Sequence, residues 1–313
     1  MTINKQAKIY VAGHGGLAGS AIVRELKAQG YTNILKRTHS ELDLTNQAAT
    51  DAFFAAEKPE YVILAAAHVG GLFDNKNRPA DFLGINLKIQ TNVIDAAYRN
   101  GCKKFVFLGS SCIYPKIADR LITEEDILTA PLEETNKGYA VAKVAGAMMC
   151  HFYRQQHGFN AITIMPPNMI GPGDNFDPEK AHVAQGLMVR MHTAQQKGDK
   201  QFVVWGTGTP RREYLHVDDF AKATVFLLNH DNGTQTMFNV GTGEDHSIME
   251  LCAIVQKLVG YTGKIITDPT KPDGTPRKTM DVSKLFALGW RPTISVNDMM
   301  ARTYNDFLQT LKV

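Results

Sequence analysis

The first 166 residues alternate between short β-rich runs and segments with helical character. The β-rich runs are KIYVAG, NILKR, YVILAAA, KKFVFLGS and NAITIMP, and helical segments lie at 17–29, 46–57, about 80–100 and 139–157. Strands that alternate with helices are joined by crossover connections, which make the strands parallel and cover both faces of the sheet with helices. The sequence therefore predicts an α/β fold built on a doubly wound parallel sheet.

A different pattern begins after residue 166. The segment PPNMIGPGDNFDP is rich in Pro, Gly and Asn and predicts a long loop, a kind of loop that is often functional in compact domains. Helices are expected at 181–197, up to about 230, and at 296–311. We expect a smaller α/β substrate-binding domain formed by 167–212 and 243–313. The chain should return to the main sheet between, so that 1–166 and 213–242 form the first domain.

Composition excludes several classes of protein. The 313 residues are 44% hydrophobic and 21% charged, and the net charge of +3 is spread along the chain, which gives no support for a nucleic-acid or membrane-surface partner. The apolar runs are far shorter than the roughly 20 residues of a transmembrane helix. With no visible secretion signal, we expect a cytoplasmic protein. The cysteines lack paired spacing, so we expect free thiols and no metal site: Cys102, Cys112, Cys150 and Cys252.

A glycine-rich turn joins the first strand to the first helix. Gly13, Gly16 and Gly19 form G-x-x-G-x-x-G, with Gly15 also available, instead of the stricter G-x-G-x-x-G. Glycines at this point allow a tight turn and let backbone N–H groups approach a pyrophosphate. The pattern alone also fits a tight turn without a ligand. Its place after the first strand favours a dinucleotide site on a Rossmann-type domain.

The end of the second strand indicates which dinucleotide is bound. It carries Lys36, Arg37, Thr38 and His39, where an NAD-binding protein would hold the ribose with an acidic residue. The planar fork of Arg37, helped by Lys36 or His39, suits the 2′-phosphate of NADP. The alternative is NAD, with the ribose held by one of two nearby carboxylates, Glu41 or Asp43.

Tyr139 and Lys143 lie four residues apart in the helical segment GYAVAKVAGAMM, so both should face the same spot. A lysine about 4 Å away would lower the pKa of the phenol from about 10 toward 7 and make it a working acid or base. The fourth strand ends in FLGSSCIYP, which places Ser110 and Ser111 at the carboxyl edge of the sheet, where such folds bind ligands. Each residue alone also fits a structural role, but the combination favours catalysis.

Several longer motifs extend this pattern over residues 12–278. They are AGHGGLAGSAI, AAAHVGG, LGSSCIYPK, YAVAKVAG, MPPNMIGPGDNF, WGTGTPRREYLHVDD, FNVGTG and KPDGTPRK. On these motifs the chain resembles the extended short-chain dehydrogenase/reductases. Within them it is similar to the branch that epimerises C3 and C5 of GDP-4-keto-6-deoxy-D-mannose and then reduces C4 with NADPH to give GDP-L-fucose.

The resemblance implies roles for individual residues. Ser110, Tyr139 and Lys143 would serve the reduction, while Cys112 and His182 would form the base and acid pair of the epimerisation. Four residues would bind the GDP-sugar: Arg190, Trp205, Arg212 and Asp273, with Arg211 as an alternative phosphate ligand. NADP would contact Gly13, His14, Gly15, Gly16, Leu17, Ala18, Gly19, Arg37, His39, Leu108, Gly109, Ser110, Ser111, Lys143, Pro166, Pro167, Asn168, Met169 and His182.

The chain departs from its relatives at a few positions. Gly15 stands where a basic residue is common, His39 where an arginine would hold the 2′-phosphate, and PPN replaces PTN near the nicotinamide. Relatives commonly form homodimers through a helix bundle. Three other functions stay open: a sister enzyme of GDP-colitose synthesis, an NAD-dependent nucleotide-sugar 4-epimerase, and a non-catalytic dinucleotide-sensing regulator.

Overall fold

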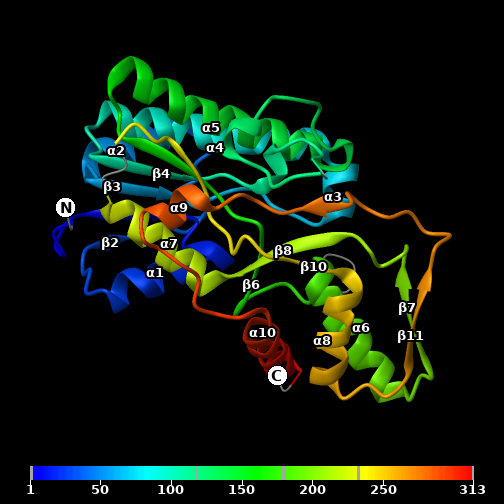
Figure 1. Ribbon diagram of the computed structural model, residues 1–313. Helices are drawn as coiled ribbons and strands as arrows, with labels where there is room; N and C mark the ends of the chain where they lie inside the picture. Colours follow the sequence, from blue (N-terminus) through cyan, green and yellow to red (C-terminus); the bar gives the residue numbers. More distant parts are fainter. Residues whose placement is uncertain (1–2, 118, 178–180, 231–232, 312–313) are drawn as a thin grey trace.

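The computed structural model describes residues 3–117, 119–177, 181–230 and 233–311, and a six-stranded sheet forms its larger part (Figure 1). The strand order is β2-β1-β3-β4-β5-β9, and every neighbouring pair is parallel. The strands are β1 (Ile9–Ala12), β2 (Ile34–Leu35), β3 (Tyr61–Leu64), β4 (Lys104–Leu108), β5 (Ala161–Met165) and β9 (Met237–Asn239). This order confirms the predicted doubly wound sheet.

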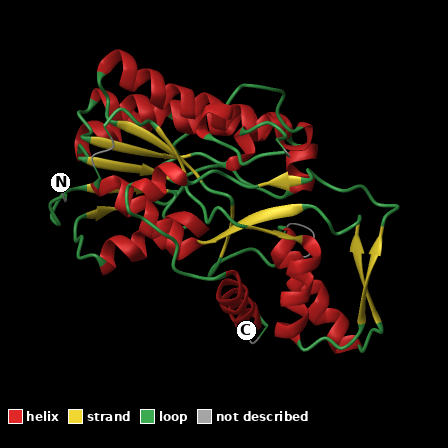
Figure 2. Cartoon of the chain, viewed as in Figure 1, coloured by secondary structure: helices red, strands yellow, loops and turns green. Residues whose placement is uncertain are grey.

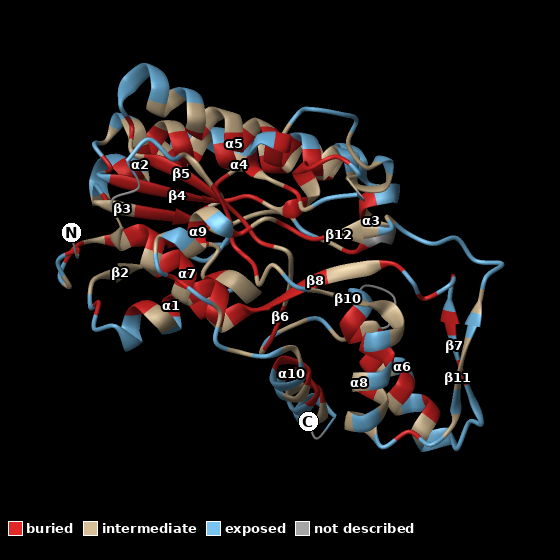
Figure 3. Cartoon of the chain, viewed as in Figure 1, coloured by how far each residue is buried: buried red, intermediate tan, exposed pale blue. Residues whose placement is uncertain are grey.

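Helices cover both faces of this sheet (Figure 2). Figure 3 shows that the strands are buried between the helices. The apolar sides of the helices and the strands form two separate buried clusters, so the sheet is apolar on both faces. One face carries α1 (Leu17–Ala28), α7 (Val217–Asn229) and the short α9 (Ser283–Ala287); the other carries α2 (Gln47–Glu57), α4 (Pro79–Arg99) and α5 (Lys137–His157). The short α3 (Leu72–Asn77) precedes α4, and single 3-10 turns lie at η1 (Ser111–Ile113), η2 (Glu124–Asp126) and η3 (Glu134–Asn136).

The second region lies beyond the carboxyl edge of the main sheet (Figure 1). Three helices and the two-stranded β7-β11 sheet share a third buried cluster. A small second sheet joins this region to the first. The helices are α6 (Val183–Lys197), α8 (Ile248–Val259) and α10 (Val296–Thr310); the strands are β6 (Asn168–Ile170), β7 (Gln201–Trp205), β8 (Arg211–His216), β10 (Asp245–Ser247), β11 (Lys264–Asp268) and β12 (Arg277–Lys278).

The second sheet differs from what the sequence suggested. Residues 213–242 were expected to rejoin the main sheet, and within them β9 joins it beside β5 while α7 packs on it, but β8 pairs with β6, β10 and β12 in the second sheet. The expected long loop also contains β6. These strands are two to six residues long and pair across large sequence separations, so no local sequence pattern predicts them. The division into two domains stays a prediction.

Two further expectations concern the chain as a whole. All four cysteines are free thiols, as predicted, and Cys112 is the one that is not buried. Within the described ranges, no helix is long and apolar enough to cross a membrane.

Candidate active site

The turn between β1 and α1 is made of backbone that tolerates no side chain at two positions. Gly13 has a φ of +80°, and a Cβ there would lie 2.5 Å from the backbone N of Ala66. A Cβ on Gly19 would lie 2.1 Å from the carbonyl oxygen of Gly13. Gly16 caps α1 without any side-chain hydrogen bond, and the first turn holds no acidic residue. This open helix N-terminus fits the pyrophosphate of a dinucleotide.

The other residues of this turn lie around the same opening. Gly15 and Gly16 are exposed, and a Cβ on Gly15 would meet nothing within 4 Å. His14 has a buried Nδ1 that finds no hydrogen-bond partner among the described residues, so it has hydrogen-bonding capacity left for a ligand atom. Leu17 and Ala18 are partly buried and pack against the main core.

The predicted 2′-phosphate site follows β2. The Arg37 guanidinium lies over the ring of Phe53, and its Nη2 is 2.8 Å from Oε1 of Glu57. Glu57 also lies 3.4 Å from the Lys8 ammonium, so it has a second cation when Arg37 turns toward a phosphate. His39 is largely exposed, with its Nδ1 3.9 Å from Asp43. Arg37 is therefore the better-placed cation for a 2′-phosphate.

The ends of β4 and β5 form the floor of the site. The N–H of Gly109 donates to Ile164 O at 2.9 Å, and the N–H of Ser111 donates to Pro166 O at 3.0 Å. These bonds hold the segments 108–111 and 166–169 side by side at the carboxyl edge. There Pro167 and Met169 are partly buried, and the Asn168 amide donates to Glu213 O at 2.9 Å.

Ser110, Tyr139 and Lys143 meet where β4 faces α5. The Lys143 ammonium lies 5.8 Å from the centre of the Tyr139 ring, so the two side chains share one helix face as predicted. Its Nζ donates to Leu108 O at 2.6 Å. The Tyr139 hydroxyl is hydrogen-bonded to the side chain of Ser110. These contacts bring the three side chains to the end of the fourth strand.

The electrostatics of this group contradict one prediction. Burial raises the pKa of the Tyr139 phenol, the nearby Cys112 thiol raises it further, and the bond with Ser110 opposes both. Burial also lowers the pKa of Lys143 to about 7, so this group carries less than a full positive charge at neutral pH. The expected lowering of the tyrosine pKa is therefore wrong here, because residue spacing reports proximity and not the loss of water. The phenol stays protonated and can donate a proton.

Cys112 and His182 are 70 positions apart in the sequence, and Cys112 follows Ser110 by two residues. Cys112 is partly exposed in η1, and its N–H donates to Ser110 Oγ at 3.2 Å. His182 is exposed at the N-cap of α6, next to residues 178–180, which lie outside the described ranges. No hydrogen bond joins it to Cys112 in the described part of the chain. Their meeting as an acid and base pair stays a prediction.

The side chains expected to bind the GDP-sugar lie in the second region. The Arg190 guanidinium is 5.7 Å from the centre of the Trp205 ring, and Trp205 is 67% exposed. Asp273 lies in the loop between β11 and β12, and its carboxylate accepts bonds from the N–H and the hydroxyl of Thr207 at 2.9 and 2.7 Å. Its oxygens are thus already engaged with the loop that follows β7.

The choice between Arg211 and Arg212 becomes clearer in the structure. Arg211 pairs with Asp245 and lies 3.2 Å from Glu250, so its charge is already balanced. Arg212 is half-buried, and within the described ranges it donates only to carbonyl oxygens, those of Arg211 and Thr275. Arg212 is therefore the better candidate for a phosphate.

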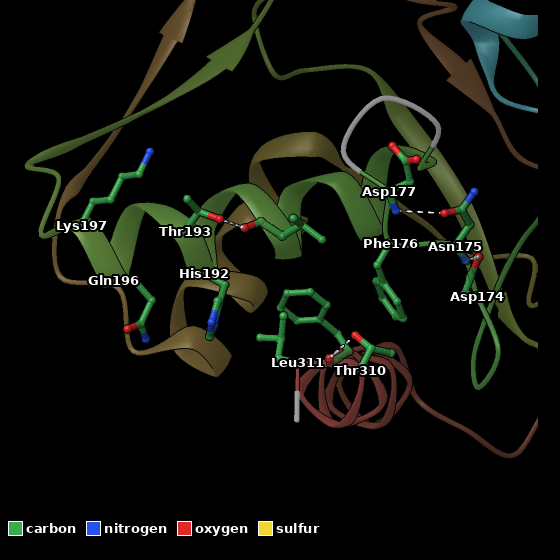
Figure 4. A pocket seen from close by; sticks show the side chains of 12 residues that line it. Asp174, Asn175, Phe176, Asp177, His192, Thr193, Gln196, Lys197, Thr310 and Leu311 are labelled. Carbon is green, nitrogen blue, oxygen red and sulfur yellow. Dashed lines mark hydrogen bonds between the residues drawn. The ribbon is translucent and has the colours of Figure 1, made fainter. Parts of the chain in front are cut away.

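A cavity of about 700 Å³ lies elsewhere, between α6, α10 and the loop after β6 (Figure 4). Apolar side chains such as Phe176, Val189 and Phe307 form much of its wall. None of the predicted catalytic or binding residues lines it. We therefore do not assign it to the proposed site.

One residue near the thiol had no expected role. The Nζ of Lys278 lies 3.7 Å from Sγ of Cys112. Membership of the motif KPDGTPRK was the signal that could have drawn attention to it.

Comparisons with known proteins agree with this geometry. Residues 9–241 match the NAD dependent epimerase/dehydratase family. GDP-L-fucose synthase 1 of Arabidopsis thaliana is 56% identical over 98% of this chain and 95% of its own, and GDP-L-fucose synthase of Escherichia coli is 45% identical over 96% and 97%. A GDP-L-fucose synthetase structure from Naegleria fowleri bound to NADP has a TM-score of 0.90 at 29% identity, covering 100% of this chain and 96% of that one. The chain belongs to the NAD dependent epimerase/dehydratase family and, within it, to the GDP-L-fucose synthase family.

Proposed function

We propose that the protein converts GDP-4-keto-6-deoxy-D-mannose to GDP-L-fucose by epimerising C3 and C5 and reducing C4 with NADPH. The observation that carries the proposal is that Cys112 lies beside Ser110, Tyr139 and Lys143 at one edge of the sheet. The chain is also 56% identical to a GDP-L-fucose synthase. Reduction alone needs no thiol at this place, whereas inversion of a carbon beside a ketone needs a base and an acid.

The proposed reaction uses these side chains in sequence. Cys112 removes a proton from a carbon next to the C4 ketone, and the electron pair moves onto the ketone oxygen. His182 returns a proton to the other face. NADPH supplies the hydride for C4 when bound. Tyr139 then donates its proton to the C4 oxygen, for which the raised pKa of its phenol keeps it in the right form.

NADP is proposed as the cofactor, with the pyrophosphate on the glycine turn before α1 and the 2′-phosphate on Arg37. The unblocked helix N-terminus supports it, as does Arg37 above Phe53, whose partner Glu57 keeps Lys8 as a second cation when Arg37 turns toward a phosphate. We propose that Arg190, Trp205, Arg212 and Asp273 bind the GDP half of the substrate.

We also propose a cytoplasmic homodimer that pairs through α4 and α5, since Val141 and Phe152 leave apolar surface exposed on α5.

The test is turnover of GDP-4-keto-6-deoxy-D-mannose with NADPH in D₂O. We expect one NADPH consumed per sugar and deuterium at both C3 and C5 of GDP-L-fucose. A Tyr139→Phe variant should lose turnover by about 10²- to 10⁴-fold. A cofactor that is not consumed would favour a 4-epimerase, and unchanged turnover in the variant would favour a dinucleotide-sensing regulator. Faster turnover of a 3,6-dideoxy keto sugar in competition would favour GDP-colitose synthesis.

A further inference from the structure

Lys278 contacts the thiol of Cys112 from a distant part of the chain. Its ammonium lies 3.7 Å from the sulfur, and 166 positions separate the two residues. Cys112 lies in the turn after β4 of the main sheet, whereas Lys278 ends β12 of the second sheet. The proposed function assigns no part to Lys278.

The backbone on both sides of Lys278 is held firmly. β12 pairs in parallel with β8, in a register that sets Lys278 beside Arg212. Arg277 Nε lies 2.6 Å from Asp245, and the N–H of Met280 donates to the buried carboxylate of Glu213 at 2.9 Å. The lysine therefore projects from a fixed strand and is not a mobile surface side chain.

The ammonium of Lys278 has no acidic partner in the part of the chain that the structure describes. Among the residues that the structure describes, no carboxylate oxygen lies within 4.0 Å of its ammonium, although its neighbour Arg277 is paired with Asp245. Of the described residues, two titratable groups face the thiol, which are Lys278 from β12 and Tyr139 from α5. A cation beside a thiol favours the thiolate, which is the form that can remove a proton.

We propose that Lys278 is a positioning residue that holds Cys112 as a thiolate for proton removal during epimerisation. The thiolate sulfur forms an S–H bond as the C–H bond beside the ketone breaks, and the electron pair moves onto the ketone oxygen. The ammonium keeps its own proton throughout. This inference rests on the proposed function, because it takes Cys112 as the base.

The first test measures the reactivity of the thiol with iodoacetamide between pH 6 and 9.5. Because Cys102, Cys150 and Cys252 are buried, labelling of the folded protein should report Cys112, and Cys112→Ser gives the blank. Lys278→Met should label about tenfold more slowly at pH 7 and come close to the wild-type rate at pH 9.5, because it lacks the cation that favours the thiolate. Lys278→Arg should restore most of the rate, since it restores the charge.

The matched control is Lys271→Met, which removes an exposed lysine from the same segment. It should label like the wild type. Thermal unfolding of each variant should show that the folded state is kept. Equal labelling in the wild type and in Lys278→Met would overturn the inference.

The second test follows deuterium entering the keto sugar from D₂O in the absence of NADPH. Lys278→Met should slow this exchange about tenfold at pH 7, and less at pH 9. If Cys112→Ser loses exchange while Lys278→Met keeps the wild-type rate, the inference is wrong and the proposed function stands. If Cys112→Ser keeps the wild-type rate, the proposed base is wrong and the inference falls with it.

Discussion

The two halves of the proposed site are built in different ways. The cofactor half is mainly backbone: a glycine turn within one short segment, where side chains must be absent. The substrate half is built from side chains of α6, β7, β8 and the loop between β11 and β12, which come together from positions far apart in the chain. Substitutions that add atoms should therefore impair the cofactor half, and substitutions that remove side-chain atoms should impair the substrate half.

The largest expected effect is the loss of Glu213, the buried carboxylate of the second half. It accepts bonds from the N–H groups of Thr242, Gly243 and Met280 at 2.7 to 2.9 Å and has no exposed surface. Glu213→Ala would leave three buried donors without an acceptor. We expect a loss of about 4 kcal/mol in the free energy of unfolding, measured by urea denaturation. A loss below 1 kcal/mol would show that the second sheet does not depend on this side chain.

Glu213→Gln tests how the buried carboxyl of Glu213 makes the stability of the protein depend on pH. Burial raises the pKa of this carboxyl from 4.5 to about 7, against the pull of the three N–H bonds. The folded state therefore holds the proton more tightly than the unfolded state between these values, so this group's contribution to stability falls as the pH rises from 4.5 to 7, by about 3 kcal/mol. Glutamine cannot titrate, and urea unfolding at pH 5 and pH 7.5 should show a flatter dependence. An unchanged slope would contradict this account.

Gly19→Ala tests the backbone half by adding one methyl group. Its carbon would lie 2.1 Å from the carbonyl oxygen of Gly13, and neither atom belongs to a flexible side chain. We expect a loss of about 2 to 3 kcal/mol in the free energy of unfolding and weaker NADPH binding by fluorescence titration. Gly15→Ala is the matched control, because its Cβ meets nothing within 4 Å and should change stability by less than about 0.5 kcal/mol. Equal losses of stability in Gly19→Ala and Gly15→Ala would show that the cofactor half is not specifically sensitive to atoms added at Gly19.

The same contrast explains what the sequence could predict. The main sheet, α1 and α5 follow from local periodicity, and the glycine turn and the shared face of Tyr139 and Lys143 follow from spacing over a few residues. The second sheet could not be predicted this way, because β6, β8, β10 and β12 are short and find partners far along the chain. The contact of Cys112 with Lys278 depends on that sheet. The direction of the tyrosine pKa shift was missed because burial is a property of the whole fold.

A smaller effect is expected for Arg37, the side chain that the cofactor half uses to bind the 2′-phosphate. Arg37→Ala should raise the Michaelis constant for NADPH about 10- to 100-fold, the range of one or two charge-assisted hydrogen bonds, and leave that for NADH nearly unchanged. Steady-state kinetics with both cofactors measures this. Lys36→Ala is the control, since its exposed side chain should matter less. Equal losses with both cofactors would assign Arg37 a role in folding through Glu57 instead of one in binding.

The smallest expected effect is at Trp205, where the second half meets solvent. Its ring is 67% exposed and contacts the Arg190 guanidinium, so its removal should change the free energy of unfolding by less than about 0.5 kcal/mol. A nucleobase stacked on it would gain about 1 to 2 kcal/mol, so Trp205→Ala should raise the Michaelis constant for the GDP-sugar about 5- to 30-fold with little change in NADPH binding. Trp205→Phe keeps an aromatic face and should recover most of the affinity. If alanine is as good as tryptophan, the base binds elsewhere, and the exposed ring needs another explanation.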